Sequence, residues 1–297
     1  MGGDGIISMN DWVLGVIGGS GLYEMDGLAD RQWIEIETPW GEPSDALLTG
    51  VLDGVKLVFL PRHGRGHRLP PSHVNARANI DALKQAGCTD VLSLSAVGSL
   101  REALDPGTFV VVDQYIDRTF AREKSFFGSG LVAHVSMAHP VCPRLSALAA
   151  QAGRDAGARV VEGGTYLCME GPQFSTRAES LLYRAWGCDV IGMTNLPEAK
   201  LAREAELPYA SVAMVTDYDC WREDGDHVDV GQIVACLHAN AARAQSLVAR
   251  LADALRGPRP PSPIDSCLDQ AVITPPAARD PVMIQKLRTV AGRALGG

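Results

Sequence analysis

Residues 211–221 read SVAMVTDYDCW, an apolar run followed at once by two acidic residues, Asp217 and Asp219. So continuous an apolar run is typical of a strand that is buried on both faces of a sheet. Two carboxylates at positions i and i+2 of an extended segment point the same way. They could bind a divalent metal, act as an acid–base pair or cap the next helix. Because that helix is predicted to begin only near Asp229, capping explains the pair less well.

Strand and helix patterns alternate along the chain on both sides of this run. Such alternation predicts an α/β fold with a largely buried sheet, packed as a single domain. The predicted strands are 13–17, a hairpin over 47–60 around Asp53-Gly54, 91–95, 109–112, 165–169, one that ends at 193, and 209–216; the predicted helices are 74–87, 143–156, 177–186, 197–206, about 229–256 and 282–295.

The two ends of the chain differ from the domain between them. We predict a flexible N-terminal tail over residues 1–11, the domain itself over 12–256, and a C-terminal arm over 257–297. The sequence GPRPPSP at 257–263 cannot be helical. It is typical of an arm that packs, with the final helix, on the domain or on a neighbouring subunit.

The composition excludes several classes of protein. No apolar run approaches the roughly 20 residues of a membrane helix, and the N-terminus lacks the features of a signal peptide. The seven cysteines are an odd number without a CxxC pair, which predicts reduced thiols in a cytoplasmic protein. The net charge of -8 leaves no broad basic surface for nucleic acid, so a few local donors must hold any phosphate.

Several predicted strand ends carry groups that can bind an anion. Each one alone has an ordinary structural explanation, as a turn or a solvated charged loop. Strand ends of an α/β sheet meet at one edge, where ligands bind, so their joint occurrence predicts an anion site there. The segments are Gly18-Gly19-Ser20-Gly21, Arg62-His63, Ser95-Ala96-Val97-Gly98-Ser99 and Met193-Thr194.

A metal site at His63, His67 and His73 is a weaker interpretation of the same region. Glycines and a proline between these histidines oppose a shared helical face, and no carboxylate joins the set.

Nine blocks of sequence, in this order and spacing, resemble the methylthioadenosine phosphorylase branch of the trimeric purine nucleoside phosphorylase family. The resemblance covers about residues 12–255. It implies a twisted, partly barrel-like mixed sheet surrounded by helices and a homotrimeric assembly. The blocks are IGGSGL (17–22), ETPWGEPSDAL (37–47), PRHGRGH (61–67), VNARANIDALKQAGC (74–88), AVGSLRE (96–102), DQYIDRT (113–119), EGPQFSTRAES (170–180), GMTNLPEAKLARE (192–204) and SVAMVTDYDCW (211–221).

The resemblance also implies a role for particular residues. Phosphate is expected at Gly19, Ser20, Arg62, His63, Ser95, Ala96 and Thr194. The purine is expected at Phe174, with Asp217 and Asp219 as catalytic residues, and the ribose near Met193. The methylthio group is expected at Val230 and Ile233, with His134 from a neighbouring subunit.

The activity implied is phosphorolysis of 5′-methylthioadenosine to adenine and 5-methylthioribose 1-phosphate. Inorganic phosphate would attack C1′ while Asp217 hydrogen-bonds or protonates purine N7, with no metal or organic cofactor. Ser20 and Ser95 stand where threonine is common in the family, which keeps the hydroxyl. Asn195 replaces a small or hydroxylated residue, and its effect is not assigned from sequence.

Three other functions compete with this one. A phosphorylase for 6-oxopurine nucleosides or 5′-methylthioinosine is disfavoured because its members usually carry Asn at the position of Asp217. A hydrolytic nucleosidase would have no use for Arg62. A catalytically silent purine-binding protein would need a defect that the sequence does not show.

Overall fold

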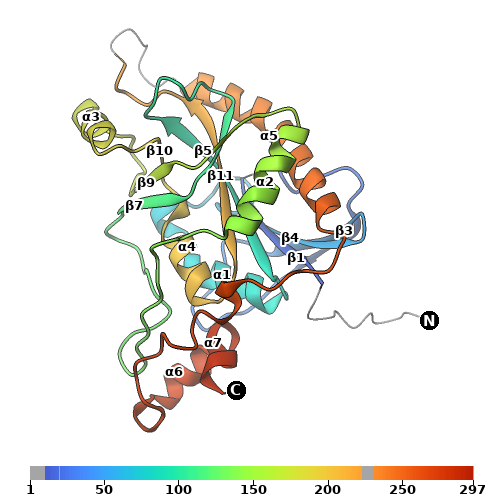
Figure 1. The fold of residues 1–297 in the computed structure, drawn as a ribbon, viewed down its shortest axis with the longest axis vertical. Coiled ribbons are helices and arrows are strands. Elements are labelled where there is room, and N and C mark those ends of the chain that lie inside the picture. Colours follow the sequence, from blue (N-terminus) through green and yellow to red (C-terminus); the bar gives the residue numbers. More distant parts are fainter. Residues whose placement is uncertain (1–10, 20, 223–229, 297) are drawn as a thin grey trace.

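The computed structural model describes residues 11–19, 21–222 and 230–296 (Figure 1). Within these ranges eleven strands form one mixed sheet, in agreement with the predicted α/β fold. The strands are β1 (Val13–Gly18), β2 (Ala29–Ile34), β3 (Leu47–Leu52), β4 (Val55–Pro61), β5 (Asp90–Ser99), β6 (Thr108–Val111), β7 (Gln114–Arg118), β8 (Arg159–Glu162), β9 (Thr165–Met169), β10 (Val190–Gly192) and β11 (Tyr209–Asp217). The helices are α1 (Ala76–Gln85), α2 (Pro143–Asp155), α3 (Arg177–Ala185), α4 (Asn195–Glu204), α5 (Val230–Ala254), α6 (Pro281–Lys286) and α7 (Arg288–Leu295).

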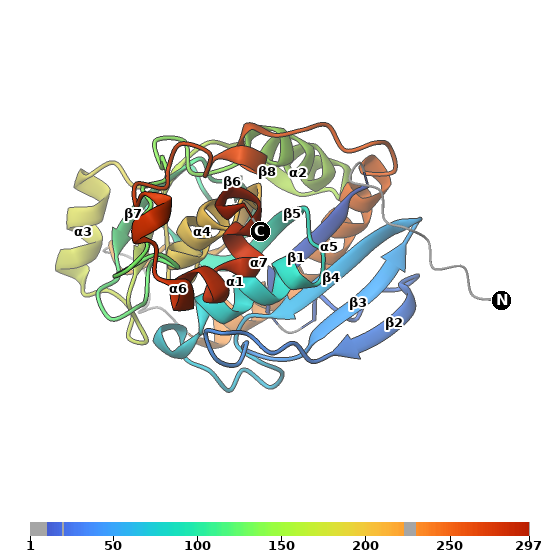
Figure 2. The ribbon, with the colours of Figure 1, turned by 90° about the horizontal axis from the view of Figure 1, so that it is seen from below.

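The centre of the sheet is buried because its strands send apolar side chains to both faces. Along β1, Val13 and Ile17 pack in one core, whereas Leu14 and Val16 pack in the other. Helices α1, α4 and α7 complete the first core and pack side by side (Figure 2). Helices α2 and α5 complete the second. The sheet is thus covered by helices on both faces.

Strand β5 is the branch point of the sheet. It pairs in parallel with β1 and β11, and its last two residues pair antiparallel with β10. Strand β11 also pairs with β6, off the main path of the sheet. The sheet therefore divides at β5 instead of lying in one layer, which is the partly barrel-like form that was expected.

Some boundaries differ from the prediction. Strand β5 was expected to end at Ser95 but continues to Ser99, because its last residues pair with β10. The predicted final helix is two helices, α6 and α7, which meet at the fully buried Leu287. The edge strands β2, β7 and β8 were not predicted, since they contain few buried residues and show no apolar run.

The C-terminal arm packs on its own domain. Arg259 bonds to Asp90, a fully buried residue at the start of β5, and Arg293 bonds to Glu206. Leu268 and Leu287 join the core beside α1 and α4. All seven cysteines are free thiols, and no described helix is both long and apolar enough to cross a membrane.

Candidate active site

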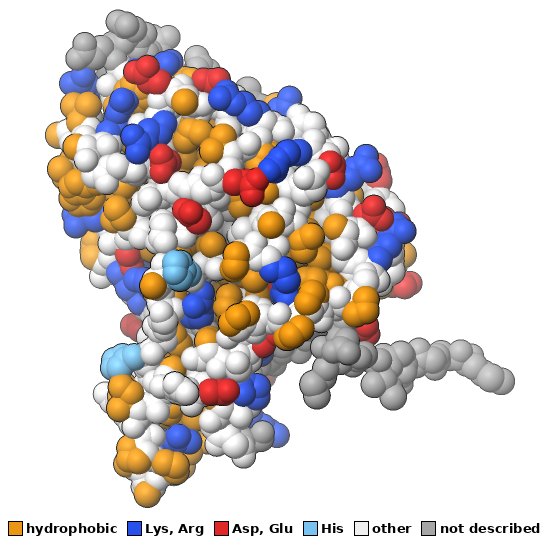
Figure 3. All heavy atoms as spheres, viewed as in Figure 1, with side chains coloured by type: hydrophobic (Ala, Val, Ile, Leu, Met, Phe, Trp, Pro, Cys, Tyr) orange, Lys and Arg blue, Asp and Glu red, His pale blue; other side chains and the backbone are white. Residues whose placement is uncertain are grey.

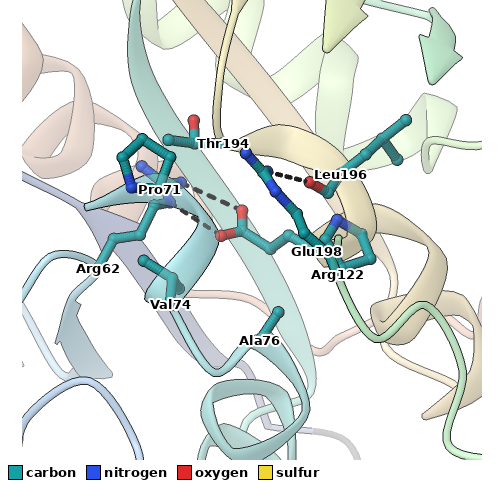
Figure 4. A pocket seen from close by; sticks show the side chains of 9 residues that line it. Arg62, Pro71, Val74, Ala76, Arg122, Thr194, Leu196 and Glu198 are labelled. Atoms are coloured by element: carbon teal, nitrogen blue, oxygen red, sulfur yellow. Dashed lines mark hydrogen bonds and ion pairs between the residues drawn. The ribbon is translucent and has the colours of Figure 1, made fainter. Parts of the chain in front are cut away.

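A small pocket lies at the start of α4 (Figure 4). Two arginines and a hydroxyl group face it, and each arginine is already paired with a carboxylate. The Arg62–Glu198 distance is 2.9 Å, and the Arg122–Glu170 distance is 3.2 Å. The pocket therefore offers hydrogen-bond donors whose charge the protein largely balances. Its lining residues are Arg62, Pro71, Val74, Ala76, Arg122, Thr194, Leu196, Pro197 and Glu198.

Arg62 is the centre of this arrangement and is only 2% exposed. Its Nε and Nη2 donate to the two carboxylate oxygens of Glu198, at 2.9 and 3.1 Å. Its Nη1 donates to the carbonyl of Leu94 at 3.0 Å. Burial would lower the pKa of Arg62, but Glu198 more than offsets this effect and raises it. Four of its five donors thus have partners, two of them on Glu198, which leaves one donor for a phosphate.

A chain of buried hydrogen bonds fixes the other side of Arg62. Arg62 Nη2 and Asn195 Nδ2 both donate to Ser93 Oγ, at 2.6 and 3.1 Å. Ser211 Oγ donates to Asn195 Oδ1 at 2.7 Å. Asn195 is fully buried, so it joins β5, β11 and α4 around the arginine. This explains the asparagine that the family comparison left unassigned. Glu198 and Ser93 were missed, although an acid within a buried helix is a signal.

Ser95 and Thr194 come together from opposite chain directions. Strand β10 runs antiparallel to β5, with Ile191 opposite Gly98, so the chain after Gly192 runs back along β5 toward Ser95. The two hydroxyls therefore converge although their strands run antiparallel. Both hydroxyl oxygens are buried and have no hydrogen-bond partner in the described part of the chain. They are free to bind an anion.

His63 lies next to Arg62, and its Nδ1 is 2.9 Å from the carbonyl of Leu69. Burial and the charge of Arg62 lower the pKa of His63 to about 4. The ring is therefore neutral at pH 7, with Nδ1 donating and Nε2 left as an acceptor. Its stacking on His67, at 4.4 Å between ring centres, is not a metal geometry. Among the described residues, no group of His, Cys, Asp or Glu could hold a metal ion.

Asp217 and Asp219 form a turn rather than the extended segment that was predicted. Asp219 has φ +50°, and its backbone N–H donates to Asp217 Oδ1 at 2.8 Å. Asp217 Oδ2 accepts from Thr216 Oγ1 at 2.7 Å, whereas Asp219 Oδ2 is buried and has no partner in the described chain. Burial raises the pKa of both carboxyl groups, and repulsion from Asp217 adds to the effect on Asp219.

Strand β5 approaches both aspartates closely. A Cβ at Gly98 would lie 3.1 Å from Asp217 Oδ1 and 3.3 Å from the Cβ of Asp219. Glycine at this position leaves room for the turn. Gly98, which contacts Asp217, follows Ser95 by only three residues on β5.

Arg122, which sequence reasoning did not single out, holds the segment that carries Met193. Its Nη1 donates to the carbonyls of Met193 and Leu196, at 2.6 and 2.7 Å. Its Nη2 donates to the carbonyl of Glu170 at 2.6 Å. Hydrogen bonds from Ser72, Phe120 and Ala121 outweigh burial and hold the pKa of Glu170 at about 2. The hydrogen bonds of Arg122 therefore fix the backbone segment that carries Met193 and Thr194.

For the remaining predicted residues within the described ranges, the structure gives a position but no contact with the pocket. Gly19 follows β1 and is half-buried, and Ala96 follows Ser95 on β5. Phe174 is 52% exposed, and the carbonyl of its neighbour Ser175 accepts from Cys220 Sγ. His134 is exposed on a segment that bonds to the C-terminal arm. Ser20 and the side chains of Val230 and Ile233 lie outside the described residues.

The sequence matches a known class of enzymes, since the family model of the phosphorylase superfamily fits residues 13–253. The chain is 63% identical over 287 residues to the S-methyl-5′-thioadenosine phosphorylase of Cereibacter sphaeroides, covering 96% of this chain and 99% of the relative. It is 62% identical to the enzyme of that name from Rhodospirillum rubrum, covering 96% and 97%.

Solved structures agree with these sequences. A methylthioadenosine phosphorylase from an antarctic soil metagenomic library has a TM-score of 0.90 at 46% identity, covering 95% of this chain and 99% of that one. A methylthioadenosine phosphorylase from Schistosoma mansoni in complex with adenine has a TM-score of 0.78 at 38% identity, covering 82% and 92%. This chain therefore belongs to the phosphorylase superfamily and, within it, to the S-methyl-5′-thioadenosine phosphorylase family, as its sequence blocks indicated.

Proposed function

We propose that this chain splits 5′-methylthioadenosine with inorganic phosphate, giving adenine and 5-methylthioribose 1-phosphate. The observation that carries the proposal is the pairing of two sites on one strand. Thr194, whose hydroxyl has no partner in the described chain, lines the same pocket as Arg62. Ser95, whose hydroxyl is likewise unpartnered, follows Leu94, the residue whose carbonyl accepts from Arg62. Three residues further along β5, Gly98 lies against Asp217. That separation is roughly 10 Å along a strand, which a nucleoside with phosphate below its sugar can span.

The residues divide the reaction between its two ends. A phosphate oxygen forms the new bond to C1′ as the bond from C1′ to N9 breaks, and the electron pair leaves with the purine. Ser95, Thr194 and the remaining Arg62 donor hold the phosphate, while the neutral His63 accepts from its O–H group. Asp217, whose pKa burial raises, donates to N7 and stabilises the departing base.

Phosphate is a co-substrate in this scheme, and no metal or organic cofactor has a role. We place Phe174 beside the purine and Met193 beside the ribose. Val230 and Ile233 are proposed to receive the methylthio group, together with His134 of a neighbouring subunit in a homotrimer. The free thiols agree with a reducing compartment, and we propose a cytoplasmic location.

The deciding experiment is adenine release from methylthioadenosine with and without phosphate. Release should require phosphate and should yield a sugar phosphate in equal amount. Undiminished release in phosphate-free buffer would overturn the proposal in favour of a nucleosidase. Absence of release under both conditions, with a folded protein, would favour a silent purine-binding protein.

A further inference from the structure

A third buried hydroxyl lies with those of Ser95 and Thr194. Tyr166 on β9 is fully buried, and its Oη has no hydrogen-bond partner in the described part of the chain. Burial raises the pKa of Tyr166 to about 12, and its contacts with Thr194 and Ser95 oppose that rise. The three oxygens therefore lie close together, although none of them makes a hydrogen bond of good geometry to another.

The position of the Tyr166 hydroxyl depends on Gly192. Strands β9 and β10 run parallel, with Tyr166 opposite Val190, and the ring reaches over the end of β10. A Cβ at residue 192 would lie 2.0 Å from Tyr166 Oη. Only glycine leaves room for the hydroxyl here, two residues before Thr194. The ring is thus directed at the segment that carries the anion donors.

Three buried hydroxyls without hydrogen-bond partners destabilise the fold unless a ligand forms hydrogen bonds with them. A buried hydroxyl without a partner is unfavourable, and most such groups in proteins are satisfied. A tetrahedral oxyanion has enough acceptor oxygens to take a hydrogen bond from each of the three. The two arginines at the pocket are balanced by Glu198 and Glu170, so neutral donors gain importance.

We propose that the Tyr166 hydroxyl is a further phosphate donor, acting with Ser95 and Thr194. The inference rests on the proposed function, because it assigns the orphaned hydroxyls to the phosphate of that reaction. Tyr166 would bind phosphate through a hydrogen bond and would not contact the nucleoside. Its removal should therefore weaken phosphate binding while leaving the methylthioadenosine site unchanged.

The chain offers a matched control in Tyr115. Its ring packs on Tyr166 at 5.8 Å between centres, and its hydroxyl is also buried without a partner in the described residues. Its side-chain contact is with Ser211, not with Thr194 or Ser95. Tyr166→Phe and Tyr115→Phe each remove one orphaned hydroxyl and keep a buried ring, so packing changes in the same way in both.

The test measures steady-state kinetics and phosphate-dependent melting of the two variants and the parent enzyme. Tyr166→Phe should raise KM for phosphate about tenfold, which corresponds to one lost hydrogen bond, and change KM for methylthioadenosine less than twofold. Added inorganic phosphate should raise its Tm less than it raises the parent's. Tyr115→Phe should match the parent in both respects.

Each failure has a separate meaning. A parent enzyme that needs phosphate, with Tyr166→Phe binding phosphate as tightly, would overturn the inference and leave the proposed function intact. A parent that releases adenine without phosphate would overturn the function itself. If Tyr166→Phe raises KM equally for phosphate and for methylthioadenosine, and lowers the Tm measured without phosphate, Tyr166 acts only in packing.

Discussion

The two acidic residues at the end of β11 differ in what surrounds their carboxyl groups. Both oxygens of Asp217 accept a hydrogen bond, from Thr216 and from the backbone of Asp219. Asp219 keeps a buried oxygen without a partner in the described chain. Asp217 is therefore held in one orientation. The role proposed for it requires this, because a fixed acid can match N6 and N7 of adenine together.

We predict that Asp217→Asn lowers kcat/KM for methylthioadenosine by about 10²–10⁴, the usual range for a lost general acid. An amide donates to both N7 and O6 of a 6-oxopurine, so the variant should shift its preference toward methylthioinosine. Both substrates are measured on both proteins, with melting curves as the folding control. Full adenine activity with an unchanged preference would make Asp217 a structural residue.

The Arg62–Glu198 pair changes how an arginine variant must be interpreted. Removing one partner of a buried ion pair leaves an uncompensated charge and costs about 3–5 kcal/mol. We predict that Arg62→Met loses both stability and activity. The double variant Arg62→Met with Glu198→Met should regain most of the stability while activity stays low. Urea unfolding and phosphorolysis rates test this, and activity that recovers together with stability would exclude Arg62 from phosphate binding.

At the scale of single elements, α4 joins the site to the rest of the fold. Its first turn supplies Asn195 and Glu198 to the network around Arg62. Its last turn supplies Glu204, whose carboxylate accepts from Ser125 Oγ and the backbone N–H of Phe126, both at 2.7 Å. No described cation bonds to Glu204, although the charge of Lys200 acts on it from a distance.

Burial raises the pKa of Glu204 to about 7, against the opposing effects of those two donors and of the charge of Lys200. At a pH below 4.5, the ordinary pKa of a glutamic acid, the group is protonated in both the folded and the unfolded chain. As pH rises from there to about 7, only the unfolded chain releases the proton, so folding stability falls across this window. The loss amounts to about 3 kcal/mol at most.

Glu204→Gln removes the titration, and we predict a Tm that depends less on pH. From pH 5 to pH 7.5, the difference between the Tm of the variant and the Tm of the parent should increase by roughly 5 °C in favour of the variant. Calorimetry at several pH values measures the difference, and any constant offset from the altered hydrogen bonds cancels. Parallel Tm curves would show that Glu204 is ionised in the folded protein throughout the window.

At the scale of the whole molecule, large apolar side chains gather on two exposed elements. Leu181, Leu182 and Trp186 lie on or directly after α3, at 42–47% exposure. Ile273, Val282 and Ile284 lie on the C-terminal arm at 38–61%. Figure 3 shows apolar atoms gathered at the upper left, over α3, and at the lower end of the molecule, over α6. Such patches are typical of protein interfaces, in agreement with the proposed homotrimer.

Subunit mixing can test whether His134 completes a neighbour's site. His134→Ala and Asp217→Asn should each be poorly active alone. Coexpressed, they should regain activity, because some sites then combine an intact Asp217 with an intact neighbouring His134. Random mixing at a heterologous interface restores roughly a quarter of the sites. Light scattering supplies the assembly state, and a mixture no more active than its components would contradict the shared site.

The sequence alone was sufficient for those features that depend on neighbouring residues. Buried strands such as 211–216 are visible as apolar runs, and the hairpin at Asp53-Gly54 is visible from its turn residues. The family could be recognised because many short blocks agree in order and spacing. Edge strands such as β2 were missed, since a strand held by one partner at the rim carries no apolar run.

Only the tertiary structure decided which distant groups meet. Arg62 pairs with Glu198, 136 residues away, and Thr194 approaches Ser95 because β10 runs antiparallel to β5. The positive φ of Asp219 and the room that Gly192 leaves for Tyr166 are likewise set by packing against other strands. A local pattern reports on the few residues beside it, whereas a buried polar group takes its partner from whichever element the folded chain brings against it.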